Sequence, residues 1–300
     1  MQEQVTQFLE YLEVEQGYSQ NTVSAYRNDL GQFLSYLQNL DLARRPRGWG
    51  NVTRDHIVSY MLEMKEREYA SSTVARKVAA VKSFFNFLVD QGYLQRNPAD
   101  ELDSPKVEKH LPSAIPPEDV DRVLAAPVGE TPTAYRDRAL LESLYATCLR
   151  VSELVALNVT DVNVDSGTVR CVGKGNKERV LPVYDRALEV INAYITEGRP
   201  ILVKNHPEEE ALFLNRRGNR LTRQGLWLII KRYVDDMDID APVTPHTLRH
   251  SFATHMLRGG AGLREVQQML GHANISTTQV YTQVSNDHLR EVYDESHPRA

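Results

Sequence analysis

Cysteine is scarce in this sequence, which contains only Cys148 and Cys171 among 300 residues. Two cysteines cannot build the disulfide framework of a small secreted domain, and these two lack the paired spacing of a zinc site. We therefore expect reduced thiols.

Long apolar runs are also missing. No stretch is long enough to cross a bilayer, and the start MQEQVTQFLEYLEVEQ lacks the basic segment followed by an apolar one that marks a secretory signal. Hydrophobic residues at 41% and charged residues at 25% are typical of a globular protein. We expect a cytoplasmic protein with no membrane contact, and the length favours two domains over one.

The chain has no surplus of positive charge. Its net charge is -5 and its pI is about 6.0, whereas proteins that bind polyanions usually carry excess Lys and Arg. Binding depends on local potential, however, and basic residues cluster here. One cluster contains no acid and holds Arg216, Arg217, Arg220 and Arg223. This cluster is either a phosphate-contact region or a solvated loop and helix start.

Residues 1–89 contain four amphipathic segments, each with apolar residues at helical spacing. Polar caps precede the second and third segments at Ser19 and Thr53, and the pair Ser71-Ser72 is the expected cap of the fourth. Four helices of moderate length with short connections predict a compact helical bundle.

Turn formers interrupt the helical pattern after this bundle. Proline recurs between residues 97 and 117, and it resists both helix interiors and central strands. We expect a linker at 90–109, a second domain at 110–294 and a terminal tail at 295–300.

The second domain combines helical patterns with a short β region. Three β-rich runs at 161–164, 168–172 and 178–183 are separated by two sequences that favour turns. The predicted fold is therefore mainly α, with an N-terminal four-helix bundle followed by an α+β domain that carries a small three-stranded antiparallel sheet.

Histidine and arginine share one side of a predicted helix. Thr244-Pro245 is a cap followed by proline at the first helical position. His246 and Arg249, three residues apart, then lie about 60° from each other around the helix axis, so both can reach one point. Together they could hold a phosphate, and a solvated polar face is the alternative.

Two further polar residues follow near helix ends. His272 stands just beyond a helix that ends at Gly271, and Tyr281 lies in the second turn of a short helix that begins at Ser276. Each has an ordinary alternative. A histidine there can be only a favourable charge at a helix terminus, and a single tyrosine among fourteen can be structural.

Two more charged groups occur earlier in the chain. Arg150 and Glu153 are three apart at the start of a predicted helix, so the carboxylate can orient the guanidinium group. Lys174 lies at a hairpin tip, where a flexible loop could bring its ammonium group to a ligand. An ordinary surface ion pair and a lysine that keeps the turn soluble are the alternatives.

The order and spacing of these residues closely resemble the tyrosine recombinase (phage integrase) family. The resemblance extends over nearly the whole chain and rests on SQNTVSAYRNDLGQF, LRVSEL, GKGNKER, HTLRHSFATHML, LGHANISTTQVYT and the terminal HPRA. Within the family, the compact length and the HPRA ending are most similar to the bacterial Xer recombinases.

This resemblance implies an enzyme that cuts and rejoins duplex DNA at specific sites through a 3′-phosphotyrosine intermediate. It implies a catalytic set of Arg150, Lys174, His246, Arg249, His272 and Tyr281. His250 matches the second histidine of the family motif, with packing as its alternative role. Cys148 departs from the pattern, because relatives commonly carry glycine there.

These residue types suit the chemistry. Guanidinium groups stay charged, donate paired hydrogen bonds to phosphate and stabilise charge that builds in the transition state. Tyr281 needs help to lose its proton, for which His246 is a candidate base, and we expect Lys174 to protonate the leaving 5′ oxygen. We expect neither a metal nor another cofactor, because the phosphotyrosine conserves the energy of the broken bond.

The resemblance also implies partners and a task. The expected partner is a duplex DNA recombination site on which four protomers assemble, either identical or mixed with a second related recombinase. A division-linked DNA translocase is a further expected partner, and residues 283–300 would supply a contact exchanged between protomers. The expected task is the resolution of chromosome dimers at cell division.

Three other functions stay open at this point. A mobile-element integrase would be favoured by an added arm-binding domain, which the amino terminus does not show. A relaxing topoisomerase and a noncatalytic DNA-binding protein of the same fold are the others.

Overall fold

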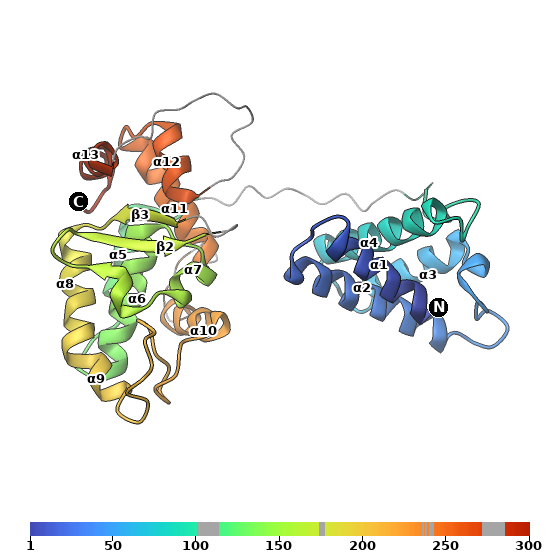
Figure 1. Cartoon of the computed structure of the whole chain (residues 1–300), viewed down its shortest axis with the longest axis horizontal. Helices are drawn as coiled ribbons and strands as arrows, with labels where there is room; N and C mark the ends of the chain where they lie inside the picture. The colour runs from blue at the N-terminus through green and yellow to red at the C-terminus, as the bar shows by residue number, and fades with distance from the viewer. Residues whose placement is uncertain are drawn as a thin grey trace. The chain divides into compact units, whose positions relative to one another are not determined.

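The computed structural model describes residues 1–100, 102, 114–173, 178–235, 237, 239, 243–271 and 286–300, with the backbone alone at 286 and 287. The chain divides into two compact units, Met1–His110 and Leu111–Ala300, and Figure 1 labels their α-helices and the strands β2 and β3. Each unit has a hydrophobic core of its own. No helix in the described ranges is long and apolar enough to span a bilayer.

The N-terminal unit contains the four predicted helices. They are α1 (Gln2–Val14), α2 (Gln20–Asn39), α3 (Arg54–Glu66) and α4 (Ser71–Asp90), with the short η1 (Trp49–Asn51) before α3. Ser19 caps α2 by accepting a hydrogen bond from the Thr22 amide, as predicted. The predicted cap of α4 is wrong, because both serines lie inside the helix and Ala70 precedes it without a side-chain cap.

Aromatic rings fill the centre of this bundle. Phe8, Phe33, Phe84 and Phe85 are buried, and Trp49 meets the edge of Phe84 with ring centroids 4.7 Å apart. Such edge-to-face pairs are favourable beyond the area that they bury. The segment expected as a linker also contributes to this core, through Ala99 and Leu102.

The second unit is mainly helical around a small sheet, which confirms the predicted fold class. Its elements are α5 (Pro117–Ala125), α6 (Pro132–Thr147), α7 (Val151–Ala156), η2 (Val159–Asp161), β1 (Val162–Asn163), β2 (Thr168–Val172), β3 (Glu178–Pro182), α8 (Asp185–Ala193), η3 (Tyr194–Gly198), α9 (Arg199–Leu202), α10 (Arg223–Val234), α11 (Pro245–Arg258), α12 (Leu263–Leu270) and α13 (Asn286–Ser296). The strands lie in the order β1-β2-β3 and are antiparallel, with Cys171 opposite Arg179.

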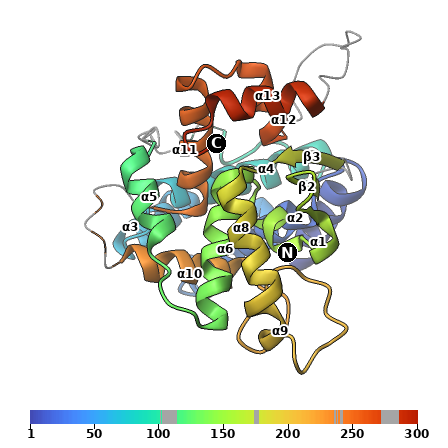
Figure 2. The same cartoon turned by 90° about the vertical axis from the view of Figure 1, so that its left-hand side faces the viewer.

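Helix α6 is buried along most of its length, because it packs against α5, α8 and α11. Figure 2 shows α6 and α8 side by side.

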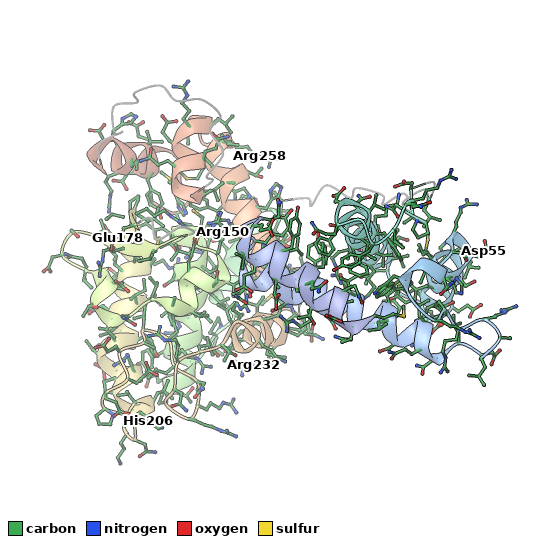
Figure 3. The ribbon with its side chains drawn as sticks, turned by 45° about the vertical axis from the view of Figure 1, so that its right-hand side comes forward. Asp55, Arg150, Glu178, His206, Arg232 and Arg258 are labelled. Carbon is green, nitrogen blue, oxygen red and sulfur yellow. The ribbon has the colours of Figure 1, made fainter. Side chains whose placement is uncertain are left out.

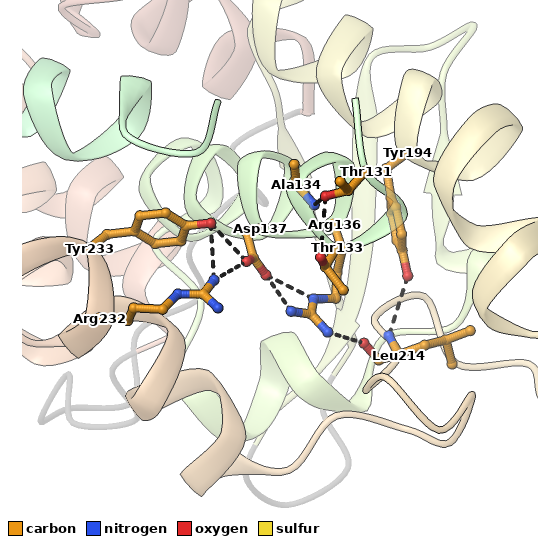
Figure 4. Close-up of polar contacts among 9 residues, drawn as sticks. All are labelled: Thr131, Thr133, Ala134, Arg136, Asp137, Tyr194, Leu214, Arg232 and Tyr233. Carbon is orange, nitrogen blue, oxygen red and sulfur yellow. Dashed lines mark hydrogen bonds and ion pairs between the residues drawn. The ribbon is translucent and has the colours of Figure 1, made fainter. Parts of the chain in front are cut away.

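Asp137, fully buried on α6, joins α10 to this helix, as Figure 4 shows. Its Oδ1 accepts hydrogen bonds from Arg136, and its Oδ2 accepts from Arg232 at 2.5 Å and from the Tyr233 hydroxyl at 2.9 Å. One buried carboxylate thus pairs with two arginines, one from its own helix and one from α10.

The four arginines of the cluster at 216–223 differ in their surroundings. Arg220 donates to the carbonyl oxygens of Val155, Ala156 and Leu157 at the end of α7, and to the side chain of Asn158. It therefore satisfies the last carbonyls of a helix. The other three arginines are exposed.

The C-terminal segment packs on its own unit. Tyr293 of α13 is buried and donates to the Ala146 carbonyl at 3.1 Å. His297 is 5% exposed and lies among the rings of Tyr145, Tyr184, Phe252 and Tyr293. Arg299 pairs with Asp121 at 2.6 Å and with Glu142 at 2.9 Å. Exchange of this segment between protomers stays a prediction.

Candidate active site

Helix α11 places two of the predicted site residues. Thr244 caps it by accepting from the Thr247 amide at 3.0 Å, and Pro245 occupies its first turn, as the sequence predicts. Its apolar stripe, at the helical spacing of Leu248, Phe252 and Met256, is buried. Burial of that stripe leaves Arg249 half-buried and His246 exposed one turn before it.

A sharp turn between α6 and α7 places Arg150. Cys148 ends α6 in the left-handed conformation, with φ 47°, and Arg150 is the residue before α7. Glycine adopts this conformation more readily than other residues, so the glycine that the resemblance leads one to expect here would suit the turn. The Cys148 carbonyl accepts a hydrogen bond from Arg249, so the turn also holds the second arginine.

The two arginines converge on the end of α12. Arg249 donates to the Leu270 carbonyl, and Arg150 donates to the next carbonyl, that of Gly271, at 3.2 Å. Gly271 ends the helix with φ 62°, as predicted for a left-handed cap. Adjacent carbonyl oxygens therefore bring two guanidinium groups to one place, one from the turn before α7 and one from α11 (Arg150 is labelled in Figure 3).

Helix α12 departs from the predicted burial at one position. Helical spacing of the apolar residues predicts one buried face for Leu263, Val266 and Leu270, but Leu263 is 59% exposed at the helix start. Met269 is buried instead.

Glu153 lies between two arginines. Its Oε1 accepts from Arg150 at 2.9 Å and its Oε2 accepts from the Arg150 amide at 2.8 Å. Arg179 of β3 donates to the same two oxygens, at 3.2 and 2.8 Å. The Glu153 side chain is only 6% exposed, so the ion pair that the sequence predicts is present and the surface alternative is wrong.

Burial and charge act in opposite directions on these groups. Burial by itself raises the pKa of the Glu153 carboxyl, but hydrogen bonds from Arg179 and Arg150 outweigh it and hold the pKa below its ordinary value. Burial lowers the pKa of Arg249, and the neighbouring charges of Arg150 and Arg179 add to this effect. The guanidinium group nevertheless stays protonated at neutral pH. The guanidinium groups of Arg150, Arg179 and Arg249 thus lie near a single carboxylate, that of Glu153. The excess of positive charge is suited to binding an anion.

Burial also decides the state of the two cysteines near this site. It raises the pKa of Cys148 to about 12 and that of Cys171 to about 11. Both thiols are therefore neutral at physiological pH, as expected for buried structural cysteines.

Three predicted site residues, Lys174, His272 and Tyr281, lie outside the described residues. The described neighbours of two of them are Gly173, which follows β2, and Gly271, which ends α12. Of the other three predicted residues, the structure brings Arg150 and Arg249 together and places His246 on the same helix as Arg249.

Sequence reasoning assigned no role to Arg179, although it stands within the GKGNKER segment. The signal for it is strand alternation, because Arg179 and the buried Leu181 share one face of β3. An arginine on the buried face of a strand needs an acidic partner.

Comparison with known proteins now assigns the family. The model of the phage integrase family matches residues 114–288, which is more than half of the chain. The chain belongs to this family of tyrosine recombinases. A second model, the N-terminal SAM-like domain of phage integrases, matches residues 5–92.

Individual tyrosine recombinases are similar in sequence to this chain over nearly its whole length. "Tyrosine recombinase XerC" of Herpetosiphon aurantiacus is 50% identical over 300 residues, covering 100% of this chain and 96% of the relative. "Tyrosine recombinase XerD" of Halalkalibacterium halodurans is 44% identical over 294 residues, covering 98% and 97%. The predicted Xer-like membership and the enzyme class are confirmed.

A solved structure shows the same fold. The lambda integrase tetramer bound to a Holliday junction has a TM-score of 0.69 at 15% identity, covering 95% of this chain and 80% of that one. At this identity the likeness concerns the fold alone.

Proposed function

We propose that this tyrosine recombinase cuts and rejoins a specific duplex DNA site with Tyr281 as its nucleophile. The observation that supports it is the convergence of Arg150 and Arg249 on adjacent carbonyl oxygens at the end of α12, directly before His272. Two guanidinium groups held this way can donate to the non-bridging oxygens of one phosphodiester. Fixed donors of this kind stabilise the charge that builds as the phosphate is attacked.

The proposed reaction is a balanced transfer of one phosphoryl bond. The Tyr281 oxygen attacks phosphorus and loses its proton to His246, while the bond to the 5′ oxygen breaks and Lys174 protonates that oxygen. His272 donates a further hydrogen bond to the phosphate. The 5′ hydroxyl of another strand then reverses the step and releases the tyrosine, so no cofactor or metal takes part.

The proposed assembly places residues 1–89 and 110–294 on opposite faces of the duplex, joined by the linker at 90–109 and followed by the tail at 295–300. Relatives named XerC and XerD support an enzyme that resolves chromosome dimers at cell division, and we propose that it acts in the cytoplasm. The lambda integrase tetramer on a Holliday junction supports four protomers on two sites. These are four copies of this chain or a mixture with a second related recombinase, and a division-linked DNA translocase is the further partner.

A covalent-adduct assay tests the nucleophile. A labelled duplex, enriched by the wild-type protein from a random-sequence library and nicked beside the mapped cleavage position, should form an SDS-resistant adduct in EDTA. Tyr281→Phe should abolish the adduct because it removes the attacking oxygen. Tyr93→Phe is the control, since the Tyr93 hydroxyl donates an exposed hydrogen bond to Gln7 in the other unit of the chain from Tyr281. Adduct formation by Tyr281→Phe overturns the assignment.

The same assay separates the alternatives. A wild-type protein that binds the duplex without forming an adduct is a noncatalytic DNA-binding protein. A protein that relaxes supercoiled plasmids without any selected site is a topoisomerase. Exchange of strands between two copies of the selected site is the result expected of a recombinase.

A further inference from the structure

Arg179 has no part in the reaction described above, yet its side chain is only 14% exposed and lies beside the site. It projects from β3, at the register position opposite Cys171. Its two outer nitrogens both donate to Glu153, the carboxylate that also holds Arg150. Burying an arginine merely to stabilise a fold is inefficient, because desolvation offsets most of the Coulomb attraction.

Arg179 also touches the turn that ends α12. A Cβ atom added to Gly271 would lie 2.4 Å from Nη1 of Arg179 and 2.9 Å from its Cζ, so the guanidinium lies directly against that backbone. Arg150 donates to the carbonyl oxygen of the same glycine. Arg179 therefore contacts both groups that hold Arg150.

We propose that Arg179 is a positioning residue, which fixes Arg150 for the phosphate through the Glu153 carboxylate and the Gly271 turn. The proposal rests on the proposed phosphate-binding role of Arg150.

Two physical effects support this role. Glu153 alone would neutralise the charge of Arg150, and Arg179 offsets that carboxylate so that positive charge stays available to a phosphate. The second effect is conformational. Arginine side chains have many rotamers, and the Arg150 side chain is 37% exposed. The Glu153 carboxylate, which accepts hydrogen bonds from both arginines, is held in one orientation and confines the Arg150 side chain to one position.

Arg170 provides a matched control on the same hairpin. It lies on β2 and pairs with Asp161 at 2.9 Å and with Glu178 at 3.6 Å. Its side chain is 51% exposed, and its acidic partners lie outside the arginine site. Arg170→Gln therefore removes an arginine with two acidic partners from the same sheet and leaves Glu153 untouched.

The test measures DNA affinity and the single-turnover cleavage rate of the full chain on the selected nicked duplex. For Arg179→Gln we expect cleavage to fall about tenfold or more while Kd changes by less than about threefold. Arg170→Gln should cleave within about twofold of wild type. In the double variant Glu153→Gln/Arg179→Gln, the two losses should be less than multiplicative, because both act through one contact.

A pH profile adds a readout that mere loss of packing would not move. The groups that face the Glu153 carboxyl are Arg150 and Arg179, with Arg249 and the neutral thiols of Cys148 and Cys171 nearby. Without Arg179 the carboxyl protonates at higher pH, so the acid side of the cleavage profile should move to higher pH in Arg179→Gln. It should stay in place in Arg170→Gln and in Arg179→Lys, which keeps the charge.

The outcomes separate the two proposals. Cleavage and a pH profile of Arg179→Gln that match those of Arg170→Gln overturn the positioning role. If circular dichroism shows that Arg179→Gln does not fold, Arg179→Lys decides the question. Its ammonium group cannot donate to both Glu153 oxygens in the fixed planar geometry of a guanidinium group, so wild-type cleavage by that variant overturns the role. Wild-type cleavage by Arg150→Gln instead overturns the proposed phosphate site itself.

Discussion

Single residues in the left-handed conformation hold the candidate site in place. Cys148 and Gly271 both have positive φ, and the carbonyl of each accepts a hydrogen bond from an arginine. The pairing of Arg150 with Glu153 could be predicted, because three-residue spacing at a helix start is local. The contact of Arg179 with Glu153 joins residues 26 apart, and that of Arg150 with Gly271 joins residues 121 apart. Only the packed fold fixes such contacts.

Gly271→Ala should lower both stability and cleavage. A left-handed φ costs an L-residue about 1–2 kcal/mol, and the added methyl would also push Arg179 away from the turn. Urea unfolding and the adduct assay measure the two effects.

Gly129→Ala is the matched variant for that experiment. Gly129 has φ +92° with nothing within 4 Å of an added Cβ, so its substitution strains the backbone without touching the site. It should lose comparable stability and keep wild-type cleavage. Equal cleavage by both variants would show that the Gly271 turn has no bearing on the site.

Helix ends, rather than helix middles, carry the described residues of the candidate site. Arg150 precedes α7, Arg249 follows the start of α11 by one turn, and Gly271 ends α12. Caps such as Thr244 and Gly271 could be predicted because capping is local chemistry. The exposure of Leu263 could not, since it depends on which neighbours α12 meets.

The packing of the segment after α13 predicts a pH dependence of stability. Burial lowers the pKa of His297 to about 3, and the charge of Arg299 adds to this. The unfolded chain binds that proton near pH 6.5, so the folded state is favoured above that pH and loses stability as pH falls from about 6.5 toward 3. The loss approaches about 1.4 kcal/mol per pH unit for one such group.

His297→Phe should remove the contribution of His297 to the pH dependence of the free energy of unfolding. Urea unfolding at several pH values between 6.5 and 5 measures it, and the stability difference between wild type and His297→Phe should shrink as pH falls. His206→Gln is the control, because the His206 side chain is 38% exposed. Parallel slopes for wild type and His297→Phe would contradict a neutral buried imidazole.

At the scale of the whole molecule, the chain consists of two units with separate cores. The sequence predicts both the helical bundle and the α+β unit, because hydrophobic period and turn formers are local patterns. The packing of Ala99 and Leu102 into the first core could not be predicted, since a turn-rich segment gives no periodic signal.

Separate cores predict separate folding. A fragment of residues 1–110 should show helical circular dichroism and cooperative urea unfolding by itself. The full chain should unfold in two transitions, one of which coincides with that of the fragment. A fragment without helical signal, together with a single transition in the full chain, would mean that the two cores depend on each other.

The hydrogen bonds at the end of α12 have a consequence for how DNA docks. The Arg150 and Arg249 guanidinium groups already donate to the partial negative charge of a helix C-terminus. In the proposed function, an arriving phosphodiester meets two guanidinium groups that these carbonyls already hold in place, and it accepts hydrogen bonds from their remaining N–H groups. Docking of this kind requires little reordering of the two side chains, and it keeps intact the helix end from which the chain continues to His272.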